Sequence, residues 1–210
     1  MNRDGTYTAQ ELMVAAASRQ IKDGELVFVG MRLPLLAFAL AKRTHAPASI
    51  GLFECGLMRD EPAPELLYTM SDPPNVAGAL WSTRMINVMA LLQQGAVQLG
   101  ILGGAELDRF GNLNTSYIGS REHPTVKLPG SGGAADIASL AGRLLILMQH
   151  ERRRFKERVD YVTSPGYGEG GDWRQWVGLP GVGPVAIVTT FGIFSFDGHT
   201  KEAVLASYHP

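Results

Sequence analysis

The segment 25–54 constrains the fold most, because it passes from strand to helix and back to strand within about 30 residues, the size of a βαβ unit. Residues 25–30 form an apolar run that a glycine stops, which is the pattern of a buried strand. Residues 34–43 begin with a proline and are largely apolar, and an Ala-Pro pair soon afterwards prevents a helix from continuing. Residues 49–54 read as a second strand that ends in Glu54. Because strands joined by a crossover helix are parallel, we expect Glu54 at the carboxyl edge of a parallel sheet.

The same alternation continues along the chain. Thr8 and Glu11 have the spacing of a capping box and begin a helix that extends to Lys22. The other predicted elements before the tail are a mainly irregular stretch over 59–75 with a short strand at 66–70, a helix at 85–94, a buried strand at 97–102, a hairpin turn at 108–112, a helix from 134 through 140 and a buried strand at 144–148. Three short strand-like pieces in the tail, at 185–190, 193–196 and 204–208, indicate antiparallel pairing. The sequence therefore predicts an α/β fold: an open, mostly parallel sheet with helices on both faces and an antiparallel C-terminal part.

The composition suits a globular protein with a sizeable core. The chain has 210 residues, of which 45% are hydrophobic and 19% charged. It shows no internal repeat at a fixed period and no linker long enough to separate two independent units. We therefore expect a single domain over residues 1–210.

Charge and cysteine usage exclude several classes of function. A net charge of -1 provides no basic field for nucleic acid or anionic membranes, and no run approaches the ~20 apolar residues of a membrane span. The N-terminus is polar rather than an apolar signal core, and a single cysteine fits a reducing compartment, so we expect a cytoplasmic protein. The histidines show no pair at metal-ligand spacing, and no metal site is predicted.

Two stretches can carry chemistry. A carboxylate at the carboxyl end of a strand, such as Glu54, is either a working group or a member of a salt bridge, and the residues alone favour the salt bridge. The loop Gly130-Ser131-Gly132-Gly133 precedes a helix and offers backbone N–H groups to an anion, but it lacks the spacing of a Walker or dinucleotide loop. A tight structural turn is the simpler interpretation of that loop.

Cys55 follows Glu54, and because neighbouring strand residues point to opposite faces, we expect an inert, packed thiol.

A wider pattern of residues favours a functional role for Glu54 and the glycine loop over a structural one. The stretch Gly51-Leu52-Phe53-Glu54-Cys55-Gly56-Leu57-Met58, with Ala41-Lys42-Arg43 and Ala46-Pro47 before it, resembles the β subunits of glutaconate coenzyme A-transferases, within the class I coenzyme A-transferase family. Further matches in the same order cover nearly the whole chain, among them Gly103-Gly104-Ala105, Gly111-Asn112, the loop 130–134, Met148-Gln149-His150-Glu151 and the stretch 160–166. Such dispersed, ordered agreement is more specific than any single motif.

The resemblance implies a fold of the coenzyme A-transferase type and a mechanism. In that family the acid matching Glu54 is the covalent nucleophile, and the backbone amides of the loop matching Gly130, Ser131, Gly132 and Gly133 lie beside it. The implied reaction moves coenzyme A between an acyl-CoA and a short (di)carboxylic acid through a glutamyl-CoA thioester. Coenzyme A is then a substrate, and no separate cofactor is expected. The implied partner is an α subunit of the same enzyme, in a hetero-oligomer of αβ pairs with the active site between the subunits.

The sequence also departs from the family. Many relatives have Glu-Asn-Gly where this chain has Glu54-Cys55-Gly56, so backbone donors must suffice for an oxyanion. No residue is assigned to the distal carboxylate of a dicarboxylic acid; Arg32 and Arg84 are possibilities, and each is more typical of a surface or structural arginine. Two alternatives stay open: an acyl-CoA hydrolase or decarboxylase on the same scaffold, and a non-catalytic binding subunit in which Glu54 is salt-bridged.

Overall fold

The computed structural model describes residues 7–65 and 67–210, and it contains a nine-stranded sheet in the order β14-β13-β12-β10-β5-β1-β2-β3-β4. The central strands β12, β10, β5, β1 and β2 are parallel, and antiparallel strands extend the sheet at both ends. Their bounds are β1 Leu26–Phe28, β2 Ile50–Phe53, β3 Leu57–Arg59, β4 Trp81–Ser82, β5 Leu99–Leu102, β10 Arg143–Met148, β12 Pro184–Thr189, β13 Gly192–Phe196 and β14 Ala203–Tyr208. The predicted fold class and its antiparallel C-terminal part are confirmed.

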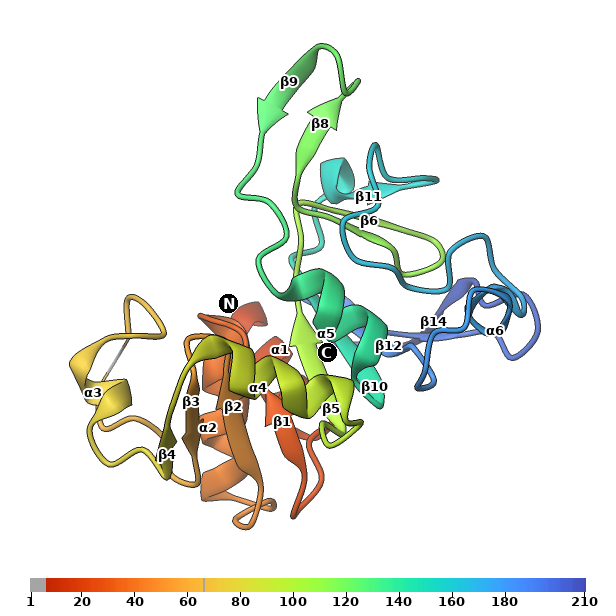
Figure 1. Cartoon of the computed structure of the whole chain (residues 1–210). Helices are drawn as coiled ribbons and strands as arrows, with labels where there is room; N and C mark the ends of the chain where they lie inside the picture. The colour runs from red at the N-terminus through yellow and green to blue at the C-terminus, as the bar shows by residue number, and fades with distance from the viewer. Residues whose placement is uncertain (1–6, 66) are drawn as a thin grey trace.

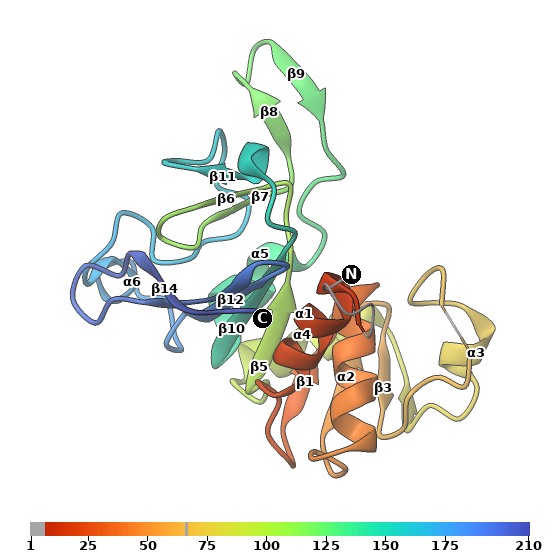
Figure 2. The same ribbon diagram turned by 180° about the vertical axis from the view of Figure 1, so that it is seen from behind.

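Helices cover both faces of this sheet. One face carries α1 (Ala9–Ser18) and α2 (Leu33–Arg43), and the other carries α4 (Met85–Gln93) and α5 (Ala134–Leu140). Figure 1 shows α4 and α5 in front of the sheet. Figure 2 shows the opposite side of the molecule, where α1 and α2 lie in front of the sheet. The short helices α3 (Pro73–Val76) and α6 (Trp173–Trp176) lie near opposite ends of the sheet.

The core has two layers because strand side chains alternate between the faces. In β1, Val27 packs into the layer beneath α1 and α2, whereas Phe28 packs into the layer beneath α4 and α5. In β10, Leu145 and Ile146 divide in the same way. The predicted βαβ unit is present as β1, α2 and β2, with Val27 opposite Gly51 in parallel register.

The N-terminal helix begins where the sequence predicted. Thr8 accepts a hydrogen bond from the Glu11 amide at 3.1 Å, and the Glu11 carboxylate accepts one from the Thr8 amide at 2.6 Å. The helix α1 ends at Ser18, four residues before the predicted end at Lys22. Residues 19–21 form a turn and a bend, in which the amides of Arg19, Gln20 and Ile21 continue the backbone hydrogen bonding.

The predicted short strand over 66–70 is wrong for residues 67–70, of which 67 is irregular and 68–70 form bends and a turn; residue 66 lies outside the described residues. The physical reason is Asp72, whose carboxylate accepts hydrogen bonds from the amides of Tyr68 at 2.6 Å and Thr69 at 3.0 Å. A local carboxylate acceptor of this kind competes with the ladder of a sheet.

A second region projects from the carboxyl edge of the main sheet. It consists of a three-stranded sheet, with β6 (Glu106–Asp108), β7 (Leu113–Asn114) and β11 (Phe155–Lys156), and a hairpin of β8 (Tyr117–Gly119) and β9 (Pro124–Lys127). The short helix η1 (Arg152–Arg154) precedes β11. Figures 1 and 2 both show the β8–β9 hairpin standing away from the body of the molecule.

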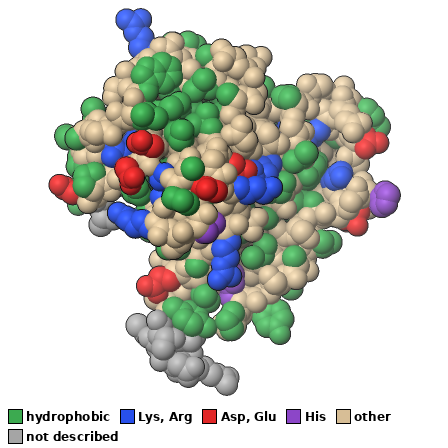
Figure 3. All heavy atoms as spheres, turned by 90° about the horizontal axis from the view of Figure 1, so that it is seen from below, with side chains coloured by type: hydrophobic (Ala, Val, Ile, Leu, Met, Phe, Trp, Pro, Cys, Tyr) green, Lys and Arg blue, Asp and Glu red, His purple; other side chains and the backbone are tan. Residues whose placement is uncertain are grey.

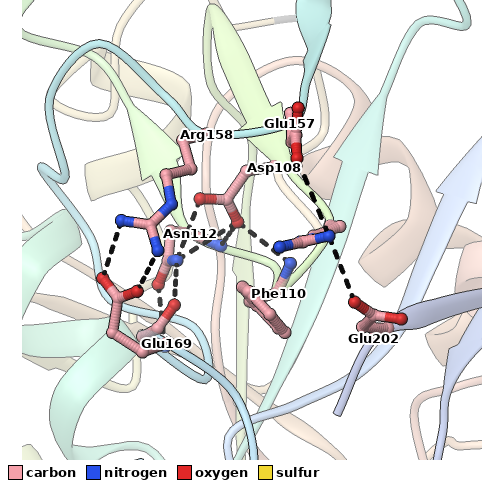
Figure 4. Close-up of polar contacts among 9 residues, drawn as sticks. Asp108, Phe110, Asn112, Glu157, Arg158, Glu169 and Glu202 are labelled. Atoms are coloured by element: carbon pink, nitrogen blue, oxygen red, sulfur yellow. Dashed lines mark hydrogen bonds and ion pairs between the residues drawn. The ribbon is translucent and has the colours of Figure 1, made fainter. Parts of the chain in front are cut away.

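The predicted turn at 108–112 joins β6 to β7 and is fastened to a distant loop. Asp108 accepts hydrogen bonds from the amides of Phe110 and Asn112, and the Asn112 side chain accepts from the amides of Gly166 at 2.8 Å and Gly168 at 3.1 Å. Figure 4 shows Asp108, Phe110 and Asn112 of this network beside the ion pair of Arg158 with Glu169. Arg109 forms ion pairs with Glu157 and Glu202. The carboxyl-edge region is therefore tied to the C-terminal third of the chain.

Candidate active site

Glu54 directly follows β2 and occupies the first position of the tight turn that joins β2 to β3. Gly56 closes this turn with a backbone φ of +102°, a conformation that favours glycine. A Cβ atom at position 56 would lie 2.2 Å from the carbonyl oxygen of Thr83, so no side chain fits there. The Thr83 amide in turn donates to the Gly56 carbonyl at 2.8 Å. This close approach places the start of α4 beside Glu54.

The glycine loop before α5 reaches the same carboxylate. The Gly133 amide donates a hydrogen bond to Glu54 Oε1 at 3.0 Å. A Cβ atom at Gly132 would lie 3.3 Å from the same oxygen, and φ of Gly132 is +48°. Gly130 and Ser131 face elsewhere, since the Gly130 amide donates to the carbonyl of Thr115 and the Ser131 hydroxyl accepts from the Ala135 amide. The structure thus brings Glu54 together with two of the four predicted loop residues.

A cavity of about 740 Å³ opens on Glu54 from the side of α4 and α5. Besides Glu54, its lining residues are Met85, Ile86, Met89, Ala90, Gln93, Gly132, Gly133, Asp136 and Leu140. Most of these side chains are apolar, and the charged ones, Glu54 and Asp136, are both acidic. This volume lies in the range of small-molecule sites, which are usually apolar pockets with a few polar groups.

The sequence did not single out the cavity-lining face of α4. That helix was predicted, and its buried residues Val88 and Leu92 account for its apolar periodicity, but Met85, Ile86 and Met89 widen the apolar face beyond them. The helix is therefore apolar over a wider face than its packing against the sheet needs. This excess was the available signal for a binding surface.

The two arginines considered for a distal carboxylate do not line this cavity. Arg32 lines a separate cavity of about 480 Å³ on the opposite side of the sheet edge, together with Gly30, Gly103 and Arg154. Arg84 is the residue that precedes α4, and its side chain is exposed. Neither position supports a role for these arginines in binding a distal carboxylate in this cavity.

Cys55 points away from the Glu54 cavity. Its side chain packs against the core layer beneath α1 and α2, and its Sγ donates to the carbonyl of Met70 at 3.2 Å. Burial raises the pKa of the Cys55 thiol above its ordinary value. A thiol with a raised pKa is a poor nucleophile at neutral pH.

Neither a metal centre nor a membrane span is found in the described part of the chain. Within residues 7–65 and 67–210, no three His, Cys, Asp or Glu side chains come together in a group that could hold a metal ion. Over the same ranges, no helix is long and apolar enough to cross a bilayer. On the face shown in Figure 3, basic and acidic side chains are interspersed among hydrophobic ones.

Known proteins resemble this chain over almost its full length. The family model described as Coenzyme A transferase matches residues 10–210. The chain is 40% identical to the B-type subunit of glutaconate CoA-transferase from Acidaminococcus fermentans, over 97% of this chain and 78% of the relative. It is 39% identical to the B-type subunit of 3-oxoadipate CoA-transferase from Pseudomonas knackmussii, with the same coverage of both chains. A more distant relative, at 26% identity over 97% of this chain and 79% of its own, is the cholesterol ring-cleaving hydrolase IpdB subunit of Mycobacterium tuberculosis.

Solved structures agree with these similarities. The crystal structure of glutaconate coenzyme A-transferase from Acidaminococcus fermentans superposes with a TM-score of 0.91 at 38% identity, covering 98% of this chain and 80% of that one. The crystal structure of the decarboxylase AibA/AibB superposes with a TM-score of 0.80 at 28% identity, covering 97% of this chain and 78% of that one.

Proposed function

Because this chain belongs to the coenzyme A transferase family, we propose that it is the β subunit of a two-subunit enzyme that moves coenzyme A between an acyl-CoA and a short (di)carboxylic acid. The partner is the α-type subunit of the same enzyme, and Glu54 is the covalent nucleophile. The observation that carries the proposal is the Gly133 amide bonded to Glu54 Oε1 at the end of an otherwise largely apolar cavity.

The hydrogen bond from Gly133 orients the carboxylate of Glu54. It occupies Oε1 and leaves Oε2 as the oxygen that attacks the thioester carbon. Holding a weak nucleophile in attack geometry contributes several kcal/mol, within the ~7 to 11 kcal/mol attributed to proximity. The attack forms a mixed anhydride between the acyl group and Glu54 and releases coenzyme A as its thiolate. That thiolate then attacks the Glu54 carbonyl carbon, which releases the first carboxylic acid and leaves a glutamyl-CoA thioester.

The acceptor acid reverses these steps. Its carboxylate attacks the glutamyl thioester, coenzyme A leaves again as the thiolate, and the new mixed anhydride is opened by this thiolate at the acyl carbon. Acyl-CoA departs and the free Glu54 carboxylate is regenerated. Each step develops negative charge on a carbonyl oxygen, and one backbone donor to such an oxyanion contributes about 2.7 to 4 kcal/mol. The Gly132 amide, which has no hydrogen-bond partner in the described part of the chain, is the donor on this subunit.

Trapping the glutamyl thioester tests this function. The αβ complex is incubated with acyl-CoA in the absence of acceptor and then treated with borohydride, which reduces a thioester to an alcohol. We expect loss of activity and a reduced residue that peptide mapping places at Glu54. Glu54→Gln should lose several orders of magnitude in kcat and remain unmodified. Cys55→Ala is the matched control at the adjacent position and should retain activity, because its thiol packs away from the cavity.

The hydrolase and decarboxylase relatives define the other outcomes of this experiment. Release of free coenzyme A without acceptor, with an unmodified chain, means that the carboxylate activates water as a general base. Loss of carbon dioxide with the thioester intact means a decarboxylase. If the complex binds acyl-CoA without turnover, the chain is a binding subunit.

A further inference from the structure

The second cavity, of about 480 Å³, opens at the carboxyl edge of the main sheet on the side of α1 and α2. Its lining includes two arginines, Arg32 and Arg154, and the neutral amide of Gln149. Among the described residues that line it, none is Asp or Glu. Two guanidinium groups without a carboxylate between them attract an anionic group, because each offers several N–H donors in a planar fork.

This cavity begins one strand away from Glu54. In the parallel register of β1 and β2, Phe28 lies opposite Leu52, and the Val29 amide continues the pairing to the Leu52 carbonyl at 2.9 Å. The same register sets Gly30, which lines the cavity, opposite Glu54. Neighbouring strands are about 4.8 Å apart. An acyl group of a few carbon atoms bonded to Glu54 therefore reaches this cavity across the edge of the sheet.

Arg32 is held in a strained backbone conformation at the mouth of α2. Its φ is +66° and its ψ is -114°, a combination that glycine adopts readily and other residues do not. The side chain is exposed, and no carboxylate in the described part of the chain forms an ion pair with it. Strained residues of this kind are concentrated at functional sites, where a ligand rather than stability accounts for them.

Arg154 supplies the second guanidinium from the start of the carboxyl-edge region. Its Nη1 donates to the carbonyl of Gly104 at 3.3 Å, and its buried Nε has no hydrogen-bond partner among the described residues. Glu151 lies 3.5 Å from this Nε but accepts a shorter hydrogen bond, at 2.6 Å, from Arg153. A buried donor without a partner is costly, and a carboxylate in the cavity supplies an acceptor for Arg154.

We propose that Arg32 and Arg154 bind the second carboxylate of a dicarboxylic acid whose first carboxyl group reacts at Glu54. The inference rests on the proposed function, because it takes the acyl group to be formed on Glu54. It names a dicarboxylic acid as the substrate class and Arg32 as a specificity-determining residue. A methyl group in place of the second carboxylate would leave both guanidinium groups without their ligand.

Arg32→Gly tests this assignment, because glycine removes the guanidinium and relieves the backbone strain at once. Glutarate and adipate serve as acceptors for the αβ complex, each compared with the monocarboxylate of equal chain length, pentanoate or hexanoate. We expect the ratio of kcat/KM for the dicarboxylate to that for the monocarboxylate to fall roughly ten- to hundredfold. Arg32→Lys keeps the charge without the planar fork and should lose less.

Stability separates this role from a structural one. Since glycine is unstrained at positive φ, the Arg32→Gly complex should unfold at a urea concentration no lower than that of the wild type. Lys201, with a φ of +62°, is the other described non-glycine residue at positive φ, and it lies in the turn between β13 and β14, outside the lining of the cavity. Lys201→Gly is therefore the matched control and should leave the ratio of kcat/KM unchanged.

Direct binding separates the proposal from the reaction. In calorimetry without coenzyme A, glutarate should bind the wild-type and Lys201→Gly complexes with equal affinity and the Arg32→Gly complex at least about tenfold more weakly. This result holds whether or not transfer occurs. A failed transfer assay with glutarate binding that depends on Arg32 refutes only the proposed function.

The remaining outcomes overturn the proposal. Equal losses for dicarboxylates and monocarboxylates, or glutarate binding that Arg32→Gly leaves intact, remove Arg32 from recognition of a second carboxylate. A loss that disappears when acyl-pantetheine replaces acyl-CoA as the donor places the phosphates of coenzyme A in the cavity. Unfolding of Arg32→Gly at a lower urea concentration assigns Arg32 a structural role, and dissociation of its αβ complex in sedimentation assigns the cavity to the partner subunit.

Discussion

At the scale of single residues, Gly132 is under two separate constraints. Its φ of +48° disfavours any side chain, and a Cβ atom would also lie 3.3 Å from Glu54 Oε1. Gly130 has a φ of +102°, but a Cβ atom there would meet no atom within 4 Å. Substitution of Gly130 therefore introduces backbone strain alone, whereas substitution of Gly132 introduces both backbone strain and a contact with the Glu54 carboxylate.

Gly132→Ala should consequently lose more activity than Gly130→Ala. We expect each variant to lose about 1 to 2 kcal/mol in the free energy of unfolding, because alanine is strained at positive φ. Only Gly132→Ala displaces Glu54, and a displacement of a few tenths of an ångström from attack geometry should lower kcat roughly tenfold or more. Steady-state kinetics and urea unfolding of the αβ complex measure the two effects. Equal losses of kcat in both variants would contradict contact with Glu54 as the cause.

Some residues of the candidate site can be predicted from the sequence and others cannot. Glu54 and the glycine loop stand at the ends of recognisable elements, so a pattern and a family resemblance both indicate them. Gln93 and Asp136 carry no such mark, because they look like ordinary polar residues of two surface helices. Their place in the cavity beside Glu54 depends on how α4 and α5 pack against each other, which is a tertiary property.

At the scale of elements, long apolar strands were predictable and very short ones were not. The strands β5 and β10 are buried almost throughout, so their apolar runs are continuous. The strands β4, β7 and β11 have two residues each, too few to show any alternation. The pairing of β4 with β3 is accompanied by the close approach of Gly56 to Thr83, two segments that local sequence does not connect.

The β6–β7 hairpin contains a buried acid whose ionisation costs stability. Burial raises the pKa of Asp108 above its ordinary value, against the opposing effect of the hydrogen bonds donated by Asn112 and by the Phe110 amide. A carboxyl group whose pKa is higher in the folded state contributes stability at pH values below its unfolded pKa. That contribution is lost as the pH rises through its folded pKa. Figure 4 shows the carboxylate enclosed by these donors.

Asp108→Asn should therefore change stability in a pH-dependent way. Asparagine cannot ionise, and it loses the hydrogen bond that Asp108 Oδ2 accepts from the Asn112 side chain, so the variant is less stable at every pH. Its deficit relative to wild type should shrink as the pH rises from 3 towards 7, since only the wild type then bears a buried charge. Urea unfolding across that range measures the difference, with the exposed Asp172→Asn as control. A deficit that grows with pH would show that the hydrogen bonds outweigh burial.

At the scale of the whole molecule, the edge of the main sheet that precedes α4 exposes apolar side chains. There Leu80 is 54% exposed and Trp81 40% exposed, and Trp81 belongs to β4, whose partner β3 follows the Glu54 turn. Obligate subunit interfaces are large and apolar, typically above ~2,000 Å². A partner that completes the active site would therefore bury Trp81, whereas Trp176 on α6 lies towards the other end of the sheet.

These positions lead to a prediction for assembly. Without its α-type partner the chain should sediment as self-associated species heavier than its 22.7 kDa monomer and show no transfer, and mixing with the partner should give a discrete, active heteromer. Trp81→Ala should weaken that heteromer by about 2 kcal/mol or more, roughly thirtyfold in Kd, because a buried tryptophan is a frequent interface hot spot. Trp176→Ala, the control with an even more exposed indole at 81%, should assemble normally. A monomeric and fully active single chain would remove the two-subunit model, and equal weakening by both variants would remove the placement of the interface beside Glu54.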